Sequence, residues 1–143
     1  MKRQTECVCV NLRRAARAMT QLYDHALAGS GITVTQYSLL SAVARNEPAS
    51  IGVLAADLDL DRTTLARNLA LLARDKFIVM QPGDDRRVSE VRLAAKGRKA
   101  LAAARPLWHQ VQTDVRARFA TGHVDQLRAI AAEATGLAAA LTK

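Results

Sequence analysis

The sequence predicts a mainly α-helical chain with one small β-hairpin, an α+β fold in which helices precede and follow the hairpin along the chain. Apolar residues recur every three or four positions in four stretches before residue 75 and again after about residue 95. Between these helical regions, residues 77–93 contain two β-prone runs around a Pro-Gly turn. A length of 143 residues, half of them hydrophobic, suits one domain or a small domain with an extension, and excludes a TIM barrel or a two-domain enzyme.

The first two helices are expected at residues 8–28 and 35–45. The first carries an apolar stripe, and the Gly29–Gly31 segment ends it. Its stripe consists of Val8, Leu12, Ala15, Met19, Leu22 and Ala26. Thr35 is the expected N-cap of the second helix, and Pro48 disfavours helix in the residue before it.

Two more helices follow, at residues 51–58 and 62–74. Ser50 and Asp61 are good N-cap residues for them because their side-chain oxygens can accept a first-turn N–H. In the second of the two, Leu65, Leu69 and Leu72 share one face, which predicts that this face is buried. Its opposite face carries Thr63, Arg67, Ala70 and Arg74.

A hairpin is expected next, because residues 77–81 and 88–93 are β-prone and residues 82–85 read Pro-Gly-Asp-Asp. Arg86 and Arg87 lie at its tip. From about residue 95 the pattern is helical again, and Pro106 predicts a bend or a break. Residues 121–123 form a joint before a last helix that carries Leu127, Ile130, Ala134, Leu137 and Leu141.

The net charge of +8 and the pI of about 10.3 predict attraction to nucleic acid, acidic partners or anionic membrane. The densest part runs from Arg86 to Lys99, where six cations face Glu90 alone. No stretch approaches the ~18 apolar residues of a membrane span. The basic N-terminal segment lacks the apolar core of an export signal, so we expect a cytoplasmic protein whose cysteines are thiols.

This order of elements is that of a winged helix-turn-helix, and its chemistry suits duplex DNA. A helix that buries its leucines leaves the other face free to enter the major groove. The candidate contacts on that helix are Arg62, Thr63, Thr64, Arg67 and Asn68. The hairpin arginines Arg86 and Arg87 suit the minor groove, whose negative potential attracts arginine.

At these positions the sequence resembles the MarR family of bacterial transcriptional regulators. The resemblance is most specific at Asp85-Arg86-Arg87 and at the segment 92–97, Arg-Leu-Ala-Ala-Lys-Gly, where Ala94 replaces a usual threonine. Residues 60–65 and the Pro-Leu-Trp step at 106–108 are also similar to the family pattern. The resemblance implies that Arg87 enters the minor groove, that Asp85 positions the wing through an ion pair, and that two subunits interlock through their first and last helices.

The apolar stripes also predict a homodimer. Residues 30–97 form the expected winged domain, while residues 1–29 and 98–143 carry stripes with too little partner surface in one chain. Burying these stripes against a second copy is the simplest solution. A two-fold axis then sets the two recognition helices about 34–36 Å apart, or a multiple of that, and predicts a palindromic operator.

A thiol-based redox sensor is one hypothesis for the signal. The segment 9–23 resembles the first helix of the organic-hydroperoxide-responsive branch of the family, which implies a reactive thiol at Cys9 and a tyrosine contact at Tyr23. The second tyrosine position of that branch holds Val34. Cys7 is a candidate second thiol between subunits, since cysteines two apart on a helix point about 200° apart and pair poorly within a chain.

The leading hypothesis is a repressor released from its operator by a small phenolic or aromatic ligand, as the resemblance implies. The candidate pocket residues are Tyr37, His25, Arg17 and Trp108, with Tyr23 beside them, and core packing is an alternative role for each. We expect no metal and no cofactor, because the histidines are isolated. A thiol redox enzyme is a remote alternative, since the sequence lacks C-x-x-C spacing and a βαβ context. A protein-interaction module is another, since it leaves the hairpin arginines unexplained.

Overall fold

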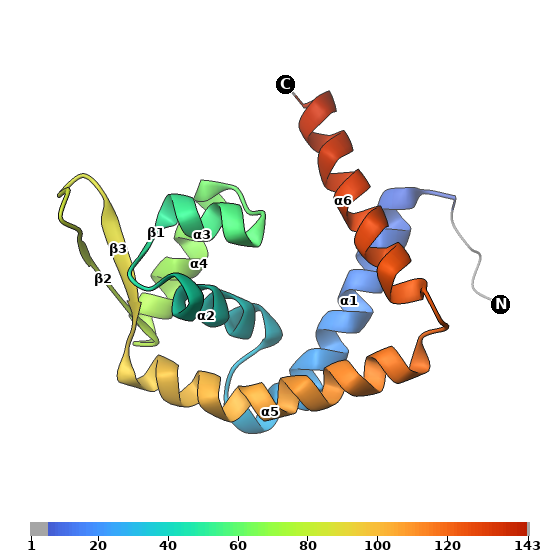
Figure 1. Ribbon diagram of the computed structural model, residues 1–143, viewed down its shortest axis with the longest axis horizontal. Coiled ribbons are helices and arrows are strands. Elements are labelled where there is room, and N and C mark those ends of the chain that lie inside the picture. The colour runs from blue at the N-terminus through green and yellow to red at the C-terminus, as the bar shows by residue number, and fades with distance from the viewer. Residues whose placement is uncertain (1–5, 143) are drawn as a thin grey trace. The chain divides into compact units, whose positions relative to one another are not determined.

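The computed structural model describes residues 6–142 as a mainly helical chain with a small antiparallel sheet, which confirms the predicted fold class (Figure 1). The helices are α1 (Val8–Leu27), the short 3-10 turn η1 (Ala28–Ser30), α2 (Val34–Asn46), α3 (Ile51–Leu58), α4 (Arg62–Arg74), α5 (Ala95–Arg118) and α6 (His123–Leu141). The strands are β1 (Ala49–Ser50), β2 (Ile78–Pro82) and β3 (Ser89–Leu93).

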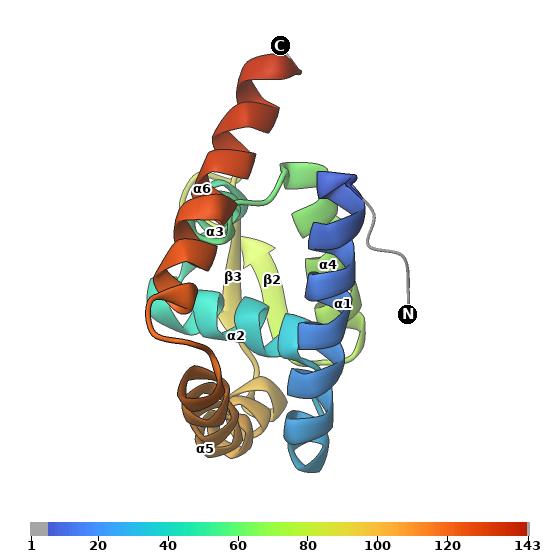
Figure 2. The same cartoon turned by 90° about the vertical axis from the view of Figure 1, so that its right-hand side faces the viewer.

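The sheet has the strand order β1-β3-β2, and both pairs are antiparallel. The predicted hairpin is present: β2 and β3 pair with Ile78 opposite Leu93 and Met80 opposite Val91. The sequence did not predict β1, which is two residues long and pairs Ala49 with Val91, far along the chain. Helix α4 lies beside β2 (Figure 2).

The chain divides into two compact units. The first ends at Trp108 and contains α1 to α4, the sheet and the first part of α5. The second begins at His109 and contains the rest of α5 and α6.

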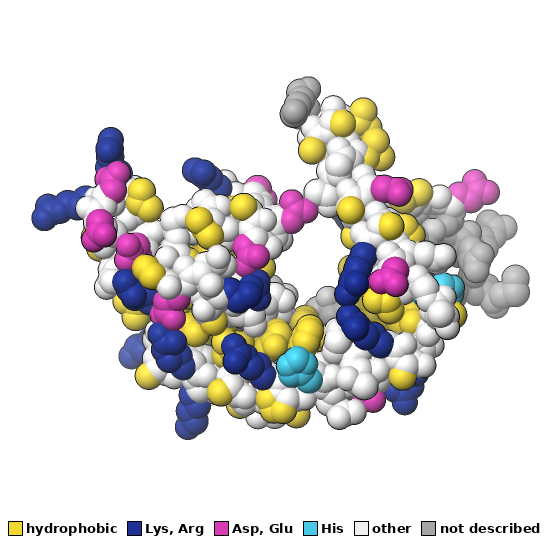
Figure 3. Space-filling view, viewed as in Figure 1, with side chains coloured by type: hydrophobic (Ala, Val, Ile, Leu, Met, Phe, Trp, Pro, Cys, Tyr) yellow, Lys and Arg dark blue, Asp and Glu magenta, His cyan; other side chains and the backbone are white. Residues whose placement is uncertain are grey.

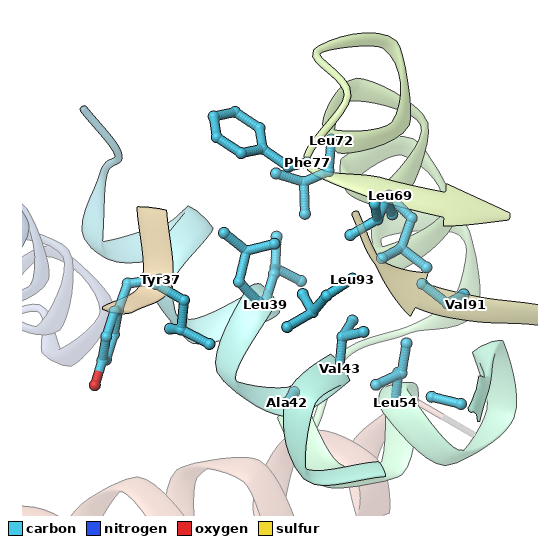
Figure 4. Packing of buried hydrophobic residues seen from close by; sticks show 14 of the residues in the cluster. Tyr37, Leu39, Ala42, Val43, Leu54, Leu69, Leu72, Phe77, Val91 and Leu93 are labelled. Carbon is cyan, nitrogen blue, oxygen red and sulfur yellow. The ribbon is translucent and has the colours of Figure 1, made fainter. Parts of the chain in front are cut away.

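The hydrophobic core of the first unit joins the helices to the sheet. Leu39 and Val43 of α2 point toward Leu93 of β3, and Leu69 of α4 lies near Val91 (Figure 4). The predicted leucine face of α4 is buried, with Leu65 and Leu69 at 0% exposure and Leu72 at 2%. The core therefore fixes which face of α4 remains in solvent.

Helix α2 begins one residue earlier than predicted, and its N-cap is Thr33, so the prediction of Thr35 as the cap is wrong. Thr33 Oγ1 accepts from the N–H of Gln36, and the Gln36 side chain accepts from the N–H of Thr33. This reciprocal pair is a capping box, which satisfies two backbone donors at the helix start where a lone hydroxyl satisfies one. Asp24 of α1 adds a third bond, accepting from the N–H of Val34 at 2.7 Å.

Helix α5 runs through Pro106 without ending, so the predicted break there is absent. A proline removes one helical N–H and crowds the carbonyl four residues earlier. Pro106 and Ala102 are both exposed, so water can bond to the carbonyl that loses its helical partner. A bend at Pro106, which the sequence predicts as the alternative to a break, is compatible with a continuous helix.

Glu47 connects the end of α2 to the sheet and to α5. Its carboxylate accepts from the N–H of Leu93 at 2.9 Å and from Nη2 of Arg98 at 2.7 Å. The Glu47 side chain is only 16% exposed, whereas that of Arg98 is 58% exposed. A charge-assisted bond to a largely covered carboxylate is stronger than one in open solvent. One side chain therefore holds three elements of the first unit in register.

Gly97 is required by a close approach of α5 to the start of the hairpin. A Cβ at this position would lie 2.0 Å from the carbonyl oxygen of Phe77, inside any real contact distance. The same Phe77 carbonyl accepts from the N–H of Ala94 at 3.0 Å, which holds the two segments together. A side chain at residue 97 would have to displace backbone.

Replacing Gly97 with alanine should destabilise the protein by about 1–3 kcal/mol, because overpacking forces the backbone to shift. The matched control is Gly136→Ala on α6, where a Cβ would meet nothing within 4 Å. There the better helix propensity of alanine should leave the free energy of unfolding equal or higher. Urea denaturation of both variants measures the difference, and equal stability of the two would contradict the close approach.

Replacing Glu47 with alanine should cost about 1–3 kcal/mol, because the N–H of Leu93 loses its acceptor. Glu47→Gln keeps a carbonyl oxygen for that N–H and loses only the charge, so it should cost less. Thermal denaturation of the two variants checks this order. A glutamine variant as unstable as the alanine variant would show that the ion pair to Arg98, and not the bond to Leu93, supplies the stabilisation.

Candidate nucleic-acid interface

Helix α4 presents a polar face to solvent. Because Leu65, Leu69 and Leu72 are buried, the residues on the other side of the helix are exposed. Thr63 and Arg67 lie there, one turn apart, and their side chains make no hydrogen bond or ion pair with any residue in 6–142. Small and cationic groups on an exposed helix face can reach the edges of bases in the major groove.

Asp61 caps α4 and at the same time binds Thr64, a residue predicted to contact DNA. Its carboxylate accepts from the N–H of Thr64 at 2.8 Å and from the Thr64 hydroxyl at 2.6 Å. These bonds, the hydroxyl first, hold the pKa of Asp61 below its ordinary value of 3.8. The Thr64 hydroxyl therefore donates its proton to the cap, and only its methyl group and lone pairs remain for another partner.

The other two predicted helix contacts lie on separate flanks of α4. Arg62 is the first residue of the helix and is exposed, while Asn68 is half-buried. Successive residues of an α-helix point about 100° apart, so Arg62 does not share a face with Thr63. The five predicted residues are thus divided among an outer face, a capped start and two flanks.

The tip of the wing is held by Asp85. Its Oδ1 accepts from the backbone N–H of Arg87 at 3.0 Å and from Nε of Arg87 at 3.2 Å. The backbone bond first and the guanidinium second hold the pKa of Asp85 below its ordinary range. The Arg87 side chain is nevertheless 90% exposed, so the carboxylate orients its guanidinium while the guanidinium still faces solvent.

Cationic side chains project from the tip of the β2–β3 hairpin, at the upper left of Figure 3. Arg86 and Arg87 are both exposed at this tip. The turn itself is closed by two backbone bonds, from Gly83 N–H to the Val88 carbonyl and from Val88 N–H to the Asp85 carbonyl, each 2.8 Å. A closed turn that carries two exposed cations is suited to a negatively charged groove.

An open groove of about 470 Å³ lies between the start of α3, helix α4 and the wing. It is lined by Gly52 of α3, by Arg62 and Ala66 of α4, and by Arg87, Val88 and Ser89 of the wing. Arg62 and Arg87, predicted separately from the sequence, therefore face one surface. Gly52 was not predicted, because its contact with Arg62 joins residues of two different helices and leaves no local signal.

The candidate redox residues lie on α1. Cys7 is the N-cap of the helix and Cys9 is its second residue, and both thiols are exposed. Tyr23 is half-buried near the other end of the same helix. Fourteen positions separate Cys9 from Tyr23 on α1, so one chain does not bring them together.

The candidate ligand residues are distributed over different environments. Tyr37 is buried and stacks on Trp108, with ring centroids 5.5 Å apart and planes inclined by 20°. Arg17 instead lines an open groove of about 340 Å³ on α1, together with Arg13, Ala16, Thr20 and Gln21. His25 is exposed.

Two further features bear on the class of protein. Within residues 6–142, no group of three His, Cys, Asp or Glu side chains is arranged to hold a metal ion. Among the described residues, every helix is too short or too polar to span a bilayer.

Comparisons with known proteins agree with this geometry. The sequence profile of the MarR family matches residues 30–87. The transcriptional regulator MosR of Mycobacterium tuberculosis, solved in complex with DNA, is 39% identical, with a TM-score of 0.84 over 96% of this chain and 100% of that chain. A second MosR structure is 38% identical, with a TM-score of 0.74 over 92% and 97% of the two chains.

A more distant match shows the same fold. MepR of Staphylococcus aureus, in a DNA complex, is 19% identical, with a TM-score of 0.75 over 92% of this chain and 98% of that chain. No curated protein matches the chain in sequence. From the profile match and the near full-length similarity to MosR, the chain belongs to the MarR family of DNA-binding transcriptional regulators, which are not enzymes.

Proposed function

We propose that this protein is a dimeric repressor that binds a palindromic operator, with α4 in the major groove and the wing in the adjacent minor groove. The observation that carries the proposal is the surface formed by the exposed face of α4 and the exposed Arg87. In this assignment Thr63, Arg67 and Asn68 contact bases, Thr64 contributes its methyl group, and Arg62, Arg86 and Arg87 bind the backbone or the minor groove. Asp85 positions Arg87.

The similarity to MosR supports duplex DNA as the partner, because that regulator was solved with DNA and is 39% identical over nearly the whole chain. Low aromatic content also supports it: only 3% of residues are Phe, Trp or Tyr, and single-strand binding depends on aromatic stacking. The net charge of +8 doubles in a dimer and favours association with phosphates.

Exposed apolar residues support the dimer. Within α1, all of whose residues are described, only Leu27 is buried, and Val8, Leu12 and Leu22 are 71%, 37% and 41% exposed. No residue of α6, which is also fully described, is buried, and Leu137 and Leu141 are 61% and 74% exposed. Burial against a second copy would remove these side chains from water. The expected division is a winged domain at residues 30–97 between dimerisation segments at 1–29 and 98–143.

The DNA-binding proposal is tested by selecting a duplex from a random library and measuring affinity for it over a range of salt concentrations. Affinity should fall steeply as salt rises, because bound phosphates release counterions. Arg87→Ala should weaken binding severalfold or more, whereas Arg105→Ala, which removes an exposed charge from α5, should not. Weak binding without sequence preference or salt dependence would contradict the proposal, and an unchanged affinity of Arg87→Ala would contradict the role of the wing.

A small phenolic or aromatic acid is one candidate for the releasing signal. The groove on α1 supports it in part, because Arg13 and Arg17 could bind a carboxylate there. Tyr37 and Trp108, however, stack on each other in the first unit and so are already partnered.

Oxidation of Cys9 is the second candidate, and two observations favour it. Cys7 and Cys9 are both exposed, and both stand at the start of α1. A Cys9 thiolate that attacks a hydroperoxide becomes a sulfenic acid and releases an alcohol. A second thiol, Cys7 of the partner subunit, then displaces water from it to give a disulfide.

One experiment on DNA-bound protein distinguishes the two candidate signals. Under the thiol proposal an organic hydroperoxide should release DNA, dithiothreitol should restore binding, and Cys9→Ser should remain bound. Under the ligand proposal an aromatic acid such as salicylate should release DNA from wild type and Cys9→Ser alike, and less from Arg17→Ala. Release of Cys9→Ser by hydroperoxide would contradict the thiol proposal, and retention of DNA by wild type in salicylate would count against that acid.

A further inference from the structure

We propose that the groove between α3, α4 and the wing binds the sugar-phosphate backbone of the DNA, with Arg62 as its phosphate ligand and Gly52 as the residue that leaves room for Arg62. The inference rests on the proposed function and adds that affinity and sequence preference come from different residues. Arg62 supplies affinity without sequence preference, and the outer face of α4 supplies the preference.

Duplex geometry requires a backbone-facing surface between the helix and the wing. The major groove and the neighbouring minor groove are separated by a ridge of phosphates. A protein that inserts a helix into one and a wing into the other must face this ridge with the surface between them. Here that surface is the groove bounded by α4 on one side and by residues 87–89 on the other.

The charge of the groove suits a phosphate. Its lining contains two guanidinium groups, Arg62 and Arg87, and no carboxylate, although Asp85 pairs with Arg87 from outside the groove. A guanidinium can donate two parallel N–H bonds to phosphate oxygens. Neither Arg62 nor the outer end of Arg87 is buried, so both can reach a ligand without a conformational change in the backbone.

The position of the Arg62 guanidinium separates it from the base-reading face. Its Nη2 atom lies 3.3 Å from the place where a Cβ of residue 52 would stand, so the side chain lies against the first turn of α3. Thr63 and Arg67 do not line the groove. Arg62 therefore contacts the phosphates between the two DNA grooves, and not the base edges that Thr63 and Arg67 approach.

Gly52 is a positioning residue in this arrangement. A methyl group here would stand 3.3 Å from Nη2 of Arg62, so the guanidinium would have to shift by a few tenths of an ångström, and the methyl would also occupy part of the groove. The backbone of Gly52 does not require glycine, since its φ is not in the left-handed region and it lies inside α3. Space for Arg62, and not backbone conformation, accounts for the glycine.

The test compares five variants with wild type on the selected duplex and on an unrelated duplex, by fluorescence anisotropy over a range of salt concentrations. Arg62→Ala should weaken binding to both duplexes by the same factor, about tenfold or more. The plot of log affinity against log salt should become shallower by about 0.9 for each phosphate that the variant no longer binds. Arg62→Lys keeps the charge and should keep most of that slope.

Two variants serve as controls, one expected to leave DNA binding unchanged and one expected to reduce only the sequence preference. Arg105→Ala removes one exposed cation from α5, at a residue that does not line the groove, and should bind nearly as wild type does. Arg67→Ala should reduce the preference for the selected duplex about tenfold, because its guanidinium no longer reaches the base edges.

The variant Gly52→Ala distinguishes a role of Gly52 in positioning Arg62 from a role in folding. Its melting temperature should be equal to or above that of wild type, because alanine is the better helix former. Its affinity for both duplexes should nevertheless fall. A purely structural role of Gly52 would predict the opposite, a lower melting temperature with unchanged affinity.

The outcomes distinguish this inference from the proposed function. If wild type shows no preference for the selected duplex and no salt dependence, the proposed function fails. If wild type binds as expected but Arg62→Ala behaves like Arg105→Ala, or lowers only the sequence preference, Arg62 is not a phosphate ligand. If Gly52→Ala binds both duplexes as wild type does, Gly52 does not position Arg62.

Discussion

Burial of the leucine face of α4 sets the arrangement of the interface. Leu65, Leu69 and Leu72 are at most 2% exposed, and together they fix the rotation of the helix about its axis. A rotation that turned Arg67 away from solvent would bring these leucines into water, at a cost of about 1.5–3 kcal/mol for each side chain. The outward direction of Thr63 and Arg67 is thus a consequence of the core.

Polar contacts then hold the surrounding elements of the first unit to this core. Asp24 joins α1 to the start of α2, and Glu47 joins the end of α2 to β3 and to Arg98 of α5. Gly97 allows α5 to approach the Phe77 backbone. The wing and α5 both begin at this junction, so a displacement of α5 would disturb the contacts that position β3. Such coupling gives a signal that displaces α5 a physical route to the wing.

Periodicity and local chemistry accounted for much of the fold. The leucine spacing of α4, the caps Ser50 and Asp61, and the Pro-Gly turn of the hairpin are local signals, and the structure confirms each. The start of α2 was misplaced because Thr33 and Thr35 are both possible caps. Only Thr33 has a glutamine three residues later, and that spacing is the signature of the capping box.

The features that escaped prediction depend on residues distant in sequence. Strand β1 has two residues and exists only because β3 lies beside it. Glu47 reads as part of a helix stop, yet its partners are Leu93 and Arg98, more than forty positions away. At the candidate interface the sequence indicates which residue types are present. It does not reveal the bond from Thr64 to Asp61 or the approach of Arg62 to Gly52.

In the proposed complex, two copies of this chain present α4 and the wing to one face of a duplex and are related by a two-fold axis. Hydroxyl-radical footprinting of the protein on its selected duplex tests this arrangement, because the reagent reports protection of the backbone. We predict two symmetric sets of protected positions whose centres lie about 10–10.5 base pairs apart, or a multiple of that. A single asymmetric protected segment, or protection of single strands only, would contradict the two-fold arrangement.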